Sequence, residues 1–262
     1  FRLVGCRAIF ATHLHELAAR ADEINRDTGG ASSVVSIVAG AEYEDRTRQD
    51  QGNADEGPVP VVYLDDKRSA RAWAVYVQDE ITLSPHFLLY AGIRHDHVST
   101  FGGSNNPRIA AVIKPIEHGT LKLLYGRAFR APTVYEMFYQ APPNYQSNPG
   151  LQPETIDTYE LAYEHDFGRG LRASLNRYSY SIRNLITQTY DTGTGITTFQ
   201  NKERAEATGT EFEVQKTWRN GASGRASYAY QKARDPNTGE PLANAPEHLA
   251  KLNIAVPLVR DR

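Results

Sequence analysis

The sequence predicts an all-β fold, an antiparallel transmembrane β-barrel of which this chain forms a part, with a short α/β segment at its N-terminus. Three observations lead to this prediction. Apolar and polar residues alternate with period two along many segments, which is the pattern of a half-buried strand. Tight and long connections alternate along the chain. Several strands also reach the length of about 9–11 residues that a tilted strand needs to cross a membrane.

Composition and charge agree with this prediction and exclude other classes. The 262 residues include 15 tyrosines and 29 basic against 31 acidic side chains, for a net charge of −2. A general nucleic-acid-binding surface needs a basic surplus, so we expect no nucleic-acid partner. The single cysteine, Cys6, excludes an intramolecular disulfide framework. No run approaches the roughly 18 apolar residues of a spanning helix, whereas barrel strands need only alternation.

The N-terminal segment 1–34 differs from the rest of the chain and is assigned as a separate domain. An apolar run at 7–12 predicts a short strand. A helix is expected next, because apolar residues recur every three or four positions: Leu14, Leu17, Ala21 and Ile24. The glycines of Asp27–Gly30 end it. The barrel domain is then expected over 35–262.

Ten strands are predicted in the barrel domain. They cover 35–46, 70–82, 86–98, 107–116, 120–130, 155–167, 171–190, 196–218, 222–232 and 247–256. Tyr159, Leu161 and Tyr163 fall on one face of their strand, with Glu160 and Ala162 on the other. In the strand 171–190 the alternation slips between Leu175 and Tyr178, for which a β-bulge is the expected explanation.

The connections carry a further signal. Short turns are expected at 83–85, 117–119, 168–170 and 219–221, and longer polar connections at 47–69, 99–106, 131–154 and 233–246. Outer-membrane barrels show this asymmetry, with tight periplasmic turns and long external loops. An open sheet cannot persist in lipid because every backbone group there must be paired, so we expect the chain to be part of a larger barrel.

Several motifs, in order, resemble the TonB-dependent outer-membrane receptor family over about residues 37–258. The segment Tyr125–Phe138 is similar to the family's Y-G-x-x-F-R-A-P strand end and the x-x-x-E-x-F that follows. Asn148–Glu154 with Tyr159-Glu160 resembles its N-P-x-L-x-P-E and Y-E. Further matches are Tyr76–Glu80, Gly92–Asp96, Gly209–Glu211 and Asn244–His248.

The resemblance implies a barrel of 22 strands, of which about ten are here, filled by a plug domain. It implies an outer-membrane receptor that imports a small metal chelate of the ferric siderophore, haem or cobalamin class. The implied partners are outer-membrane lipid and the TonB energy-coupling protein, which a plug outside this sequence would contact. The resemblance implies no cofactor.

The start of the chain resembles a different family. Ala11-Thr12-His13-Leu14-His15-Glu16-Leu17 is similar to a segment of MutS-type mismatch-repair ATPases, in which His13 would lie near the nucleotide γ-phosphate. A phosphate-binding G-x-x-x-x-G-K-[ST] loop does not occur in this sequence. We therefore expect 1–34 to be a fusion or assembly artefact; the alternative is a MutS-like ATPase fragment with a β-rich extension.

The connection 131–154 holds the candidate ligand-binding residues. Its aromatic side chains could stack on a planar ligand: Tyr135, Phe138, Tyr139 and Tyr145. Arg127 and Arg130 lie at its base and could attract an anionic chelate. The alternatives are an aromatic girdle or packing beneath the loop for the aromatics, and pairing with carboxylates inside the barrel for the arginines.

Other chemistry is not expected. His13 and His15 are two residues apart and diverge on a helix, so no metal site is predicted there. The acidic stretch 42–56 is expected to be a solvated loop rather than a cation site. No nucleophile, base and orienting group occur at motif spacing, so the chain is not expected to be an enzyme. A soluble β-sandwich binding module is the remaining alternative, although the strands are long for one.

Overall fold

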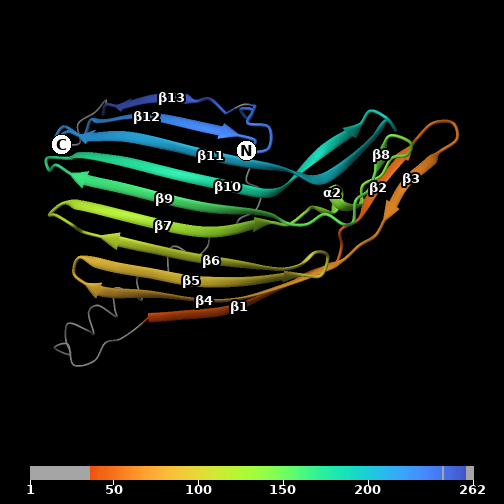
Figure 1. Ribbon diagram of the computed structural model, residues 1–262, viewed down its shortest axis with the longest axis horizontal. Helices are drawn as coiled ribbons and strands as arrows, with labels where there is room; N and C mark the ends of the chain where they lie inside the picture. Colours follow the sequence, from red (N-terminus) through yellow and green to blue (C-terminus); the bar gives the residue numbers. More distant parts are fainter. Residues whose placement is uncertain (1–35, 244, 258–262) are drawn as a thin grey trace.

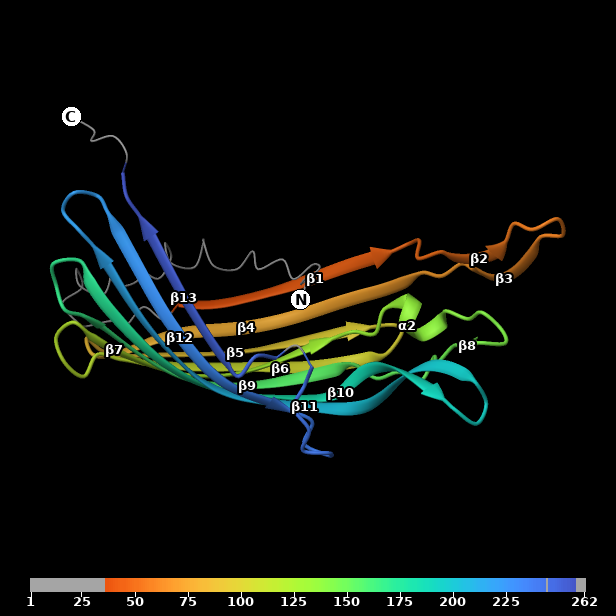
Figure 2. The ribbon, with the colours of Figure 1, turned by 90° about the horizontal axis from the view of Figure 1, so that it is seen from above.

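The computed structural model describes residues 36–243 and 245–257, and these form one large antiparallel sheet (Figure 1). The predictions for 1–34, including the strand, the helix and His13, lie outside the described residues. Seen from above, the sheet is strongly curved, as the wall of a barrel is (Figure 2). The path of strands in this part of the chain is open, with β1 at one edge and β13 at the other.

The elements, in chain order, are β1 (Ser36–Arg46), β2 (Gln51–Asp55), β3 (Val61–Asp66), β4 (Ala70–Ser84), β5 (Phe87–Val98), β6 (Gly102–Ile113), β7 (Gly119–Arg130), α2 (Val134–Phe138), β8 (Tyr145–Gln146), β9 (Glu154–Asp166), β10 (Leu171–Asp191), β11 (Ile196–Thr217), β12 (Ser223–Arg234) and β13 (His248–Ala255). The sheet follows the order β1-β4-β5-β6-β7-β9-β10-β11-β12-β13. β2 and β3 form a separate hairpin, and β8 pairs in parallel with β11.

All ten predicted strands are confirmed, and the differences lie at their ends and in the loops. β6 begins at Gly102, so the connection before it is shorter than expected. The predicted loop 47–69 contains the hairpin β2–β3, and the predicted loop 131–154 contains α2 and β8. Among the described residues, no helix combines the length and apolar character that crossing a membrane requires.

One face of the sheet carries large apolar side chains from edge to edge. Cross-strand pairs place Val77 opposite Ile93, Leu123 opposite Leu161, and Leu175 opposite Phe212. The exposed large side chains on this face are Ile37, Tyr43, Trp73, Val75, Val77, Ile93, Ile109, Leu123, Tyr159, Leu161, Leu175, Phe212, Tyr228, Leu252 and Ile254. A row of exposed apolar groups this long needs a hydrocarbon environment, so this face is the one that meets lipid.

The opposite face is polar and carries side-chain networks. Arg94 donates to Glu42 and to Asp96, each at 2.8 Å. Tyr90 donates to Gln78, and Lys122 donates to Glu164 at 2.7 Å. These residues alternate along their strands with the apolar set, as the two-residue period of a strand requires.

The bulge expected between Leu175 and Tyr178 is not there. The pairing of β10 with β9 is continuous from Arg172 to Arg183, and the register with β11 shifts only after Ile182. The alternation slips for a different reason: Arg177 stands on the apolar face, and Tyr178 stands on the polar face. Tyr178 stacks there on Tyr180, with ring centroids 4.7 Å apart.

Two glycines on the polar face allow tyrosine rings to lie flat against the backbone. Gly40 pairs with Tyr76, and Gly209 pairs with Tyr178. In each pair the tyrosine ring occupies the space that a Cβ on the glycine would take. Glycine is therefore required for this close approach, and the ring covers the backbone that the glycine exposes.

Candidate functional site

The long connections meet at one end of the sheet. The hairpin β2–β3, α2, β8 and the extended ends of β10 and β11 all lie there, and the tight turns lie at the other end (Figures 1 and 2). This end holds all the predicted ligand-binding residues, and among them Arg127 stands on the apolar face of the sheet.

α2 has a well-defined start for a helix of five residues. Thr133 is its N-cap, and its Oγ1 accepts a hydrogen bond from the Glu136 N–H at 3.2 Å. The Glu136 carboxylate in turn accepts from the Thr133 N–H at 2.7 Å. This reciprocal pair is a capping box, which satisfies two N–H groups that the helix start leaves free.

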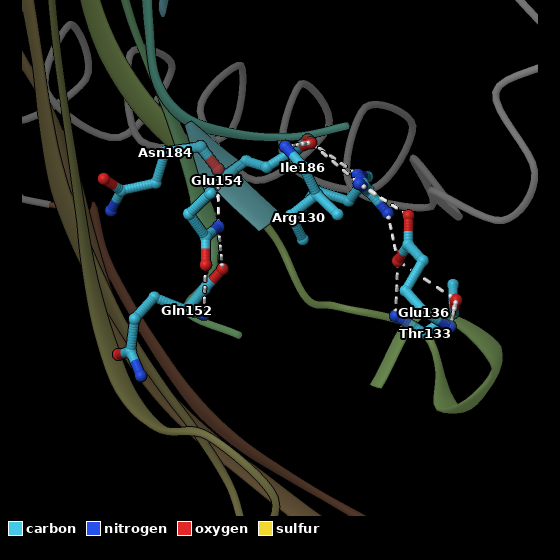
Figure 3. Close-up of polar contacts among 8 residues, drawn as sticks. Arg130, Thr133, Glu136, Gln152, Glu154, Asn184 and Ile186 are labelled. Atoms are coloured by element: carbon cyan, nitrogen blue, oxygen red, sulfur yellow. Dashed lines mark hydrogen bonds and ion pairs between the residues drawn. The ribbon is translucent and has the colours of Figure 1, made fainter. Parts of the chain in front are cut away.

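Arg130 connects this helix to the sheet. Its guanidinium donates to both oxygens of Glu154, at 2.6 and 2.7 Å, and to both oxygens of Glu136, at 3.0 and 3.1 Å (Figure 3). Glu154 Oε1 also accepts from the buried Ile186 N–H at 2.8 Å. We call Arg130, Glu136 and Glu154 the loop latch, because these three residues join β7, α2, β9 and β10.

The latch holds Glu136 in its charged form. Burial by itself raises the pKa of Glu136, but the hydrogen bonds from Arg130 and Thr133 outweigh burial and lower this pKa below its ordinary value. Charge-assisted bidentate pairs of this kind are among the stronger hydrogen bonds in proteins. The carboxylate is therefore a fixed part of the structure at neutral pH.

A second contact closes the far end of the connection. The Asn201 side chain accepts from the Gln152 N–H and donates to the Gln152 carbonyl, each at 2.8 Å. It also donates to the carbonyl of Asn184, which has a left-handed backbone at the register shift of β10. Gln152 and Asn184 lie together beside Glu154 in Figure 3. Both ends of the connection 131–153 are thus tied to the sheet.

A small apolar core lies under the connection. Met137 and Leu151 are 2% and 1% exposed and pack with Ile186, Phe138 and Phe199. Core packing in the rest of the described sheet is sparse, as is usual for a wall one sheet thick. This cluster therefore holds α2 against the extended ends of β10 and β11, which contribute Ile186 and Phe199.

Three of the four predicted loop aromatics gather in one group. Tyr135 and Tyr139 have ring centroids 4.6 Å apart, and Tyr139 meets Tyr145 edge-on at 5.8 Å. Phe199, which the sequence did not indicate, joins through Tyr135 at 5.8 Å. We call Tyr135, Tyr139, Tyr145 and Phe199 the aromatic cluster. Tyr135 remains 48% exposed, so one ring of the cluster is available to a ligand.

Phe138, the fourth predicted aromatic, lies elsewhere. It packs against the core, and the Arg68 guanidinium lies 3.5 Å from its ring centroid. This is cation–π contact distance. The hairpin also reaches α2, because Gln51 donates to the Val134 carbonyl at 2.9 Å and Asn53 to the Tyr139 hydroxyl at 3.2 Å. Phe138 thus takes the expected alternative of packing beneath the loop.

The two predicted arginines stand on opposite faces. Arg130 is on the polar face, paired with carboxylates as the alternative prediction had it. Arg127 is on the apolar face beside Tyr125, and it donates to Asp157 at 2.7 and 3.2 Å. The expectation that both arginines point inside is corrected for Arg127, because three residues along a strand reverse the face.

A cavity of about 360 Å³ lies next to the latch, between the sheet and the start of α2. Gln49, Gln51, Thr133 and Met137 are among the residues that line it. Gln49 Oε1 is buried without a hydrogen-bond partner among the described residues. Within these residues, no group of three histidine, cysteine, aspartate or glutamate side chains could hold a metal ion.

Comparison with known proteins identifies the family. The family model described as "TonB dependent receptor-like, beta-barrel" matches residues 11–257. The chain belongs to this family. The match begins inside the segment 1–34 and covers all ten strands of the sheet.

Two curated relatives of this TonB-dependent receptor chain illustrate the range of the family. One is the ferric enterobactin receptor PirA of Pseudomonas aeruginosa, 29% identical over 249 residues, covering 81% of this chain and 33% of the relative. Another is the vitamin B12 transporter BtuB of Vibrio cholerae, 29% identical over 192 residues, covering 73% of this chain and 29% of the relative. The chain spans about a third of the length of these relatives.

The solved structure of the siderophore receptor PirA from Pseudomonas aeruginosa superimposes with a TM-score of 0.61 at 25% identity, covering 75% of this chain and 36% of that one. The barrel expectation is confirmed, and the location is the outer membrane. Family members are receptors and not enzymes. In such barrels the tight turns face the periplasm and the long loops face outside. Because the outward face of such a barrel is apolar and its interior is polar, the apolar face of the sheet points to lipid and the polar face points to the lumen.

Proposed function

We propose that this chain forms part of the wall and mouth of a receptor that takes up a metal chelate, of the ferric siderophore, haem or cobalamin class. TonB would supply the energy through a plug domain. The relatives support the class, because one is named for ferric enterobactin and another for vitamin B12.

The aromatic cluster is the observation that carries this proposal. It places Tyr135, Tyr139, Tyr145 and Phe199 together at the extracellular end, and Tyr135 stands on the helix α2, which the loop latch holds in place. Aromatic rings give a large contact area at a low cost in conformational entropy. Tyr135 provides the exposed surface, and Tyr139 and Phe199 support its ring.

Arg130 has a supporting role in this proposal. Its guanidinium makes four hydrogen bonds to the carboxylates of Glu154 and Glu136, so its charge is largely compensated. Its main role is therefore to position the helix that carries Tyr135. Attraction of an anionic chelate by the exposed edge of its guanidinium is a lesser role. Arg127 takes no part in this lumen site, because it stands on the lipid-facing side.

The test is direct binding to the protein purified from outer membranes in detergent. The probes are ferric enterobactin, haemin and cyanocobalamin. Binding of each probe is measured by the change in tryptophan fluorescence. We expect one of the probes to bind. Tyr135→Ala should lower the affinity for that probe about 3- to 10-fold, which is the contribution of one aromatic contact. Tyr190→Ala is the matched control, since Tyr190 is also exposed at this end but outside the cluster. Equal losses in both variants would contradict the proposal.

A further inference from the structure

A group of charged residues stands on the lipid-facing side near the extracellular end. Their outward direction follows from register, because each shares its face with the apolar row described above. We call them the outer basic belt: Arg127, Asp157, Arg177, Arg183, Glu206, Lys232 and Arg234. The belt contains five cations and two carboxylates, an excess of three positive charges, although the whole chain has a net charge of −2.

The centre of the belt is a triad of two arginines on one carboxylate. Arg127 donates to both Asp157 oxygens, at 2.7 and 3.2 Å, and Arg183 donates to Asp157 Oδ2 at 2.5 Å. Tyr125 adds a hydrogen bond from its hydroxyl to Oδ1 at 3.2 Å. Asp157 is buried by these partners, while both arginines remain partly exposed.

The triad leaves one positive charge without an anion. One carboxylate neutralises one guanidinium, and the second guanidinium is held beside it on a surface that faces the membrane. Charged side chains near lipid are costly unless they are paired or reach polar headgroups. Arg177 lies opposite Leu161, two same-face rows nearer the hydrocarbon than Asp157; it donates to the Thr210 hydroxyl at 2.9 Å and has no ion pair among the described residues. The belt therefore lacks a compensating negative charge at the triad and at Arg177.

Neighbouring aromatics place the belt at headgroup depth. Tyr125 and Tyr159 lie next to the triad with ring centroids 4.9 Å apart, and such outward tyrosines mark the membrane–water interface. Tyr230 and His248 form a similar pair at 5.0 Å on the far side of the belt. Leu161 lies opposite Arg177, and toward the periplasm the same face continues with apolar side chains such as Leu175 and Phe212.

From this arrangement we propose that the outer basic belt binds the phosphate-bearing headgroup of an outer-leaflet lipid. Arg127 and Arg183 form the phosphate seat, and Arg177 extends it toward the acyl chains. Guanidinium groups match phosphate oxygens in bidentate geometry, and the apolar row beneath provides the surface for the chains. The inference rests on the outer-membrane location and is independent of which chelate the lumen site takes.

Lipid binding to the protein purified from outer membranes in non-ionic detergent tests the proposal, with native mass spectrometry as the measurement. The probes are a glycolipid that carries phosphomonoesters, the same glycolipid after dephosphorylation, and inorganic phosphate. We expect the phosphorylated glycolipid to bind more tightly than the dephosphorylated one. Arg183→Gln and Arg177→Gln should each weaken its binding about fivefold, the effect of one basic residue at an anionic surface.

Arg225→Gln is the matched control, because Arg225 is an ion-paired strand arginine that faces the lumen. Arg177→Gln is the variant less prone to misfold, because among the described residues the Arg177 side chain makes a single hydrogen bond, to the Thr210 hydroxyl, and no ion pair. Equal binding of both glycolipids, or an equal loss in Arg225→Gln, would overturn the proposal. Binding of inorganic phosphate as tight as that of the glycolipid would also overturn it, because the site would then recognise the free anion.

Discussion

Arg130 and Glu154 face each other across neighbouring strands with two parallel hydrogen bonds, of 2.6 and 2.7 Å. Arg130 is the last residue of β7 and Glu154 is the first residue of β9. The pair therefore closes the base of the whole connection 131–153, which carries α2 and most of the aromatic cluster. A single guanidinium then reaches from this pair to Glu136 on the helix.

Replacing Arg130 by lysine should loosen this connection while keeping its charge. A lysine cannot make two bidentate pairs at once, so α2 loses its tie to the sheet. We expect a local loss of about 1–3 kcal/mol, because Glu154 and the Ile186 N–H lie in a buried network. Hydrogen exchange of the Ile186 amide measures it, and Arg225→Lys at the periplasmic end is the control. Unchanged protection at Ile186 would show that the latch is not needed.

The stability of the connection should depend on pH through Glu136. The pKa of Glu136 is lowered in the folded protein, so its contribution is complete above its ordinary value of 4.5. That contribution is lost as the pH falls through the lowered folded pKa. Proteolysis within 131–153 should therefore become faster in acid, when assayed with an acid-active protease. In Glu136→Gln this acid-dependent step should be smaller, and a step of the same size would contradict the assignment.

Gly209→Ala should destabilise the sheet, because its Cβ would collide with the Tyr178 ring. Overpacking of this kind costs about 1–3 kcal/mol. Gly126→Ala is the matched control: a Cβ there would meet nothing within 4 Å, and its backbone is not left-handed. Urea unfolding in lipid vesicles compares the two variants. Equal midpoints would show that Tyr178 can move away at no cost.

Tyr139→Phe should separate the hairpin from the helix without removing a ring from the aromatic cluster. It deletes the hydroxyl that accepts from Asn53 at 3.2 Å, a bond worth about 0.5–1.5 kcal/mol. We expect faster proteolysis in β2–β3 and unchanged protection at Ile186. Tyr145→Phe, whose hydroxyl lies outside this contact, is the comparison. Equal rates for both variants would contradict a docked hairpin.

Local patterns predicted most of the sheet. The alternation at Tyr159, Leu161 and Tyr163 placed these residues on one face, and the structure confirms it through their partners Tyr125, Leu123 and Leu121. The same two-residue period applies to Arg127 and Arg130, which we expected to face the ligand together. Three positions apart on a strand, they had to face opposite sides. The signal was present in the sequence.

The sequence alone determined the class, the strands and the order of short and long connections, because alternation and turn residues are local properties of the chain. Only the tertiary structure showed which distant side chains meet. Phe199 joins Tyr135, Glu154 pairs with Arg130, and Arg183 shares Asp157 with Arg127. Strand register fixes these contacts, and register is set by pairing along the whole sheet, which no local stretch of sequence contains.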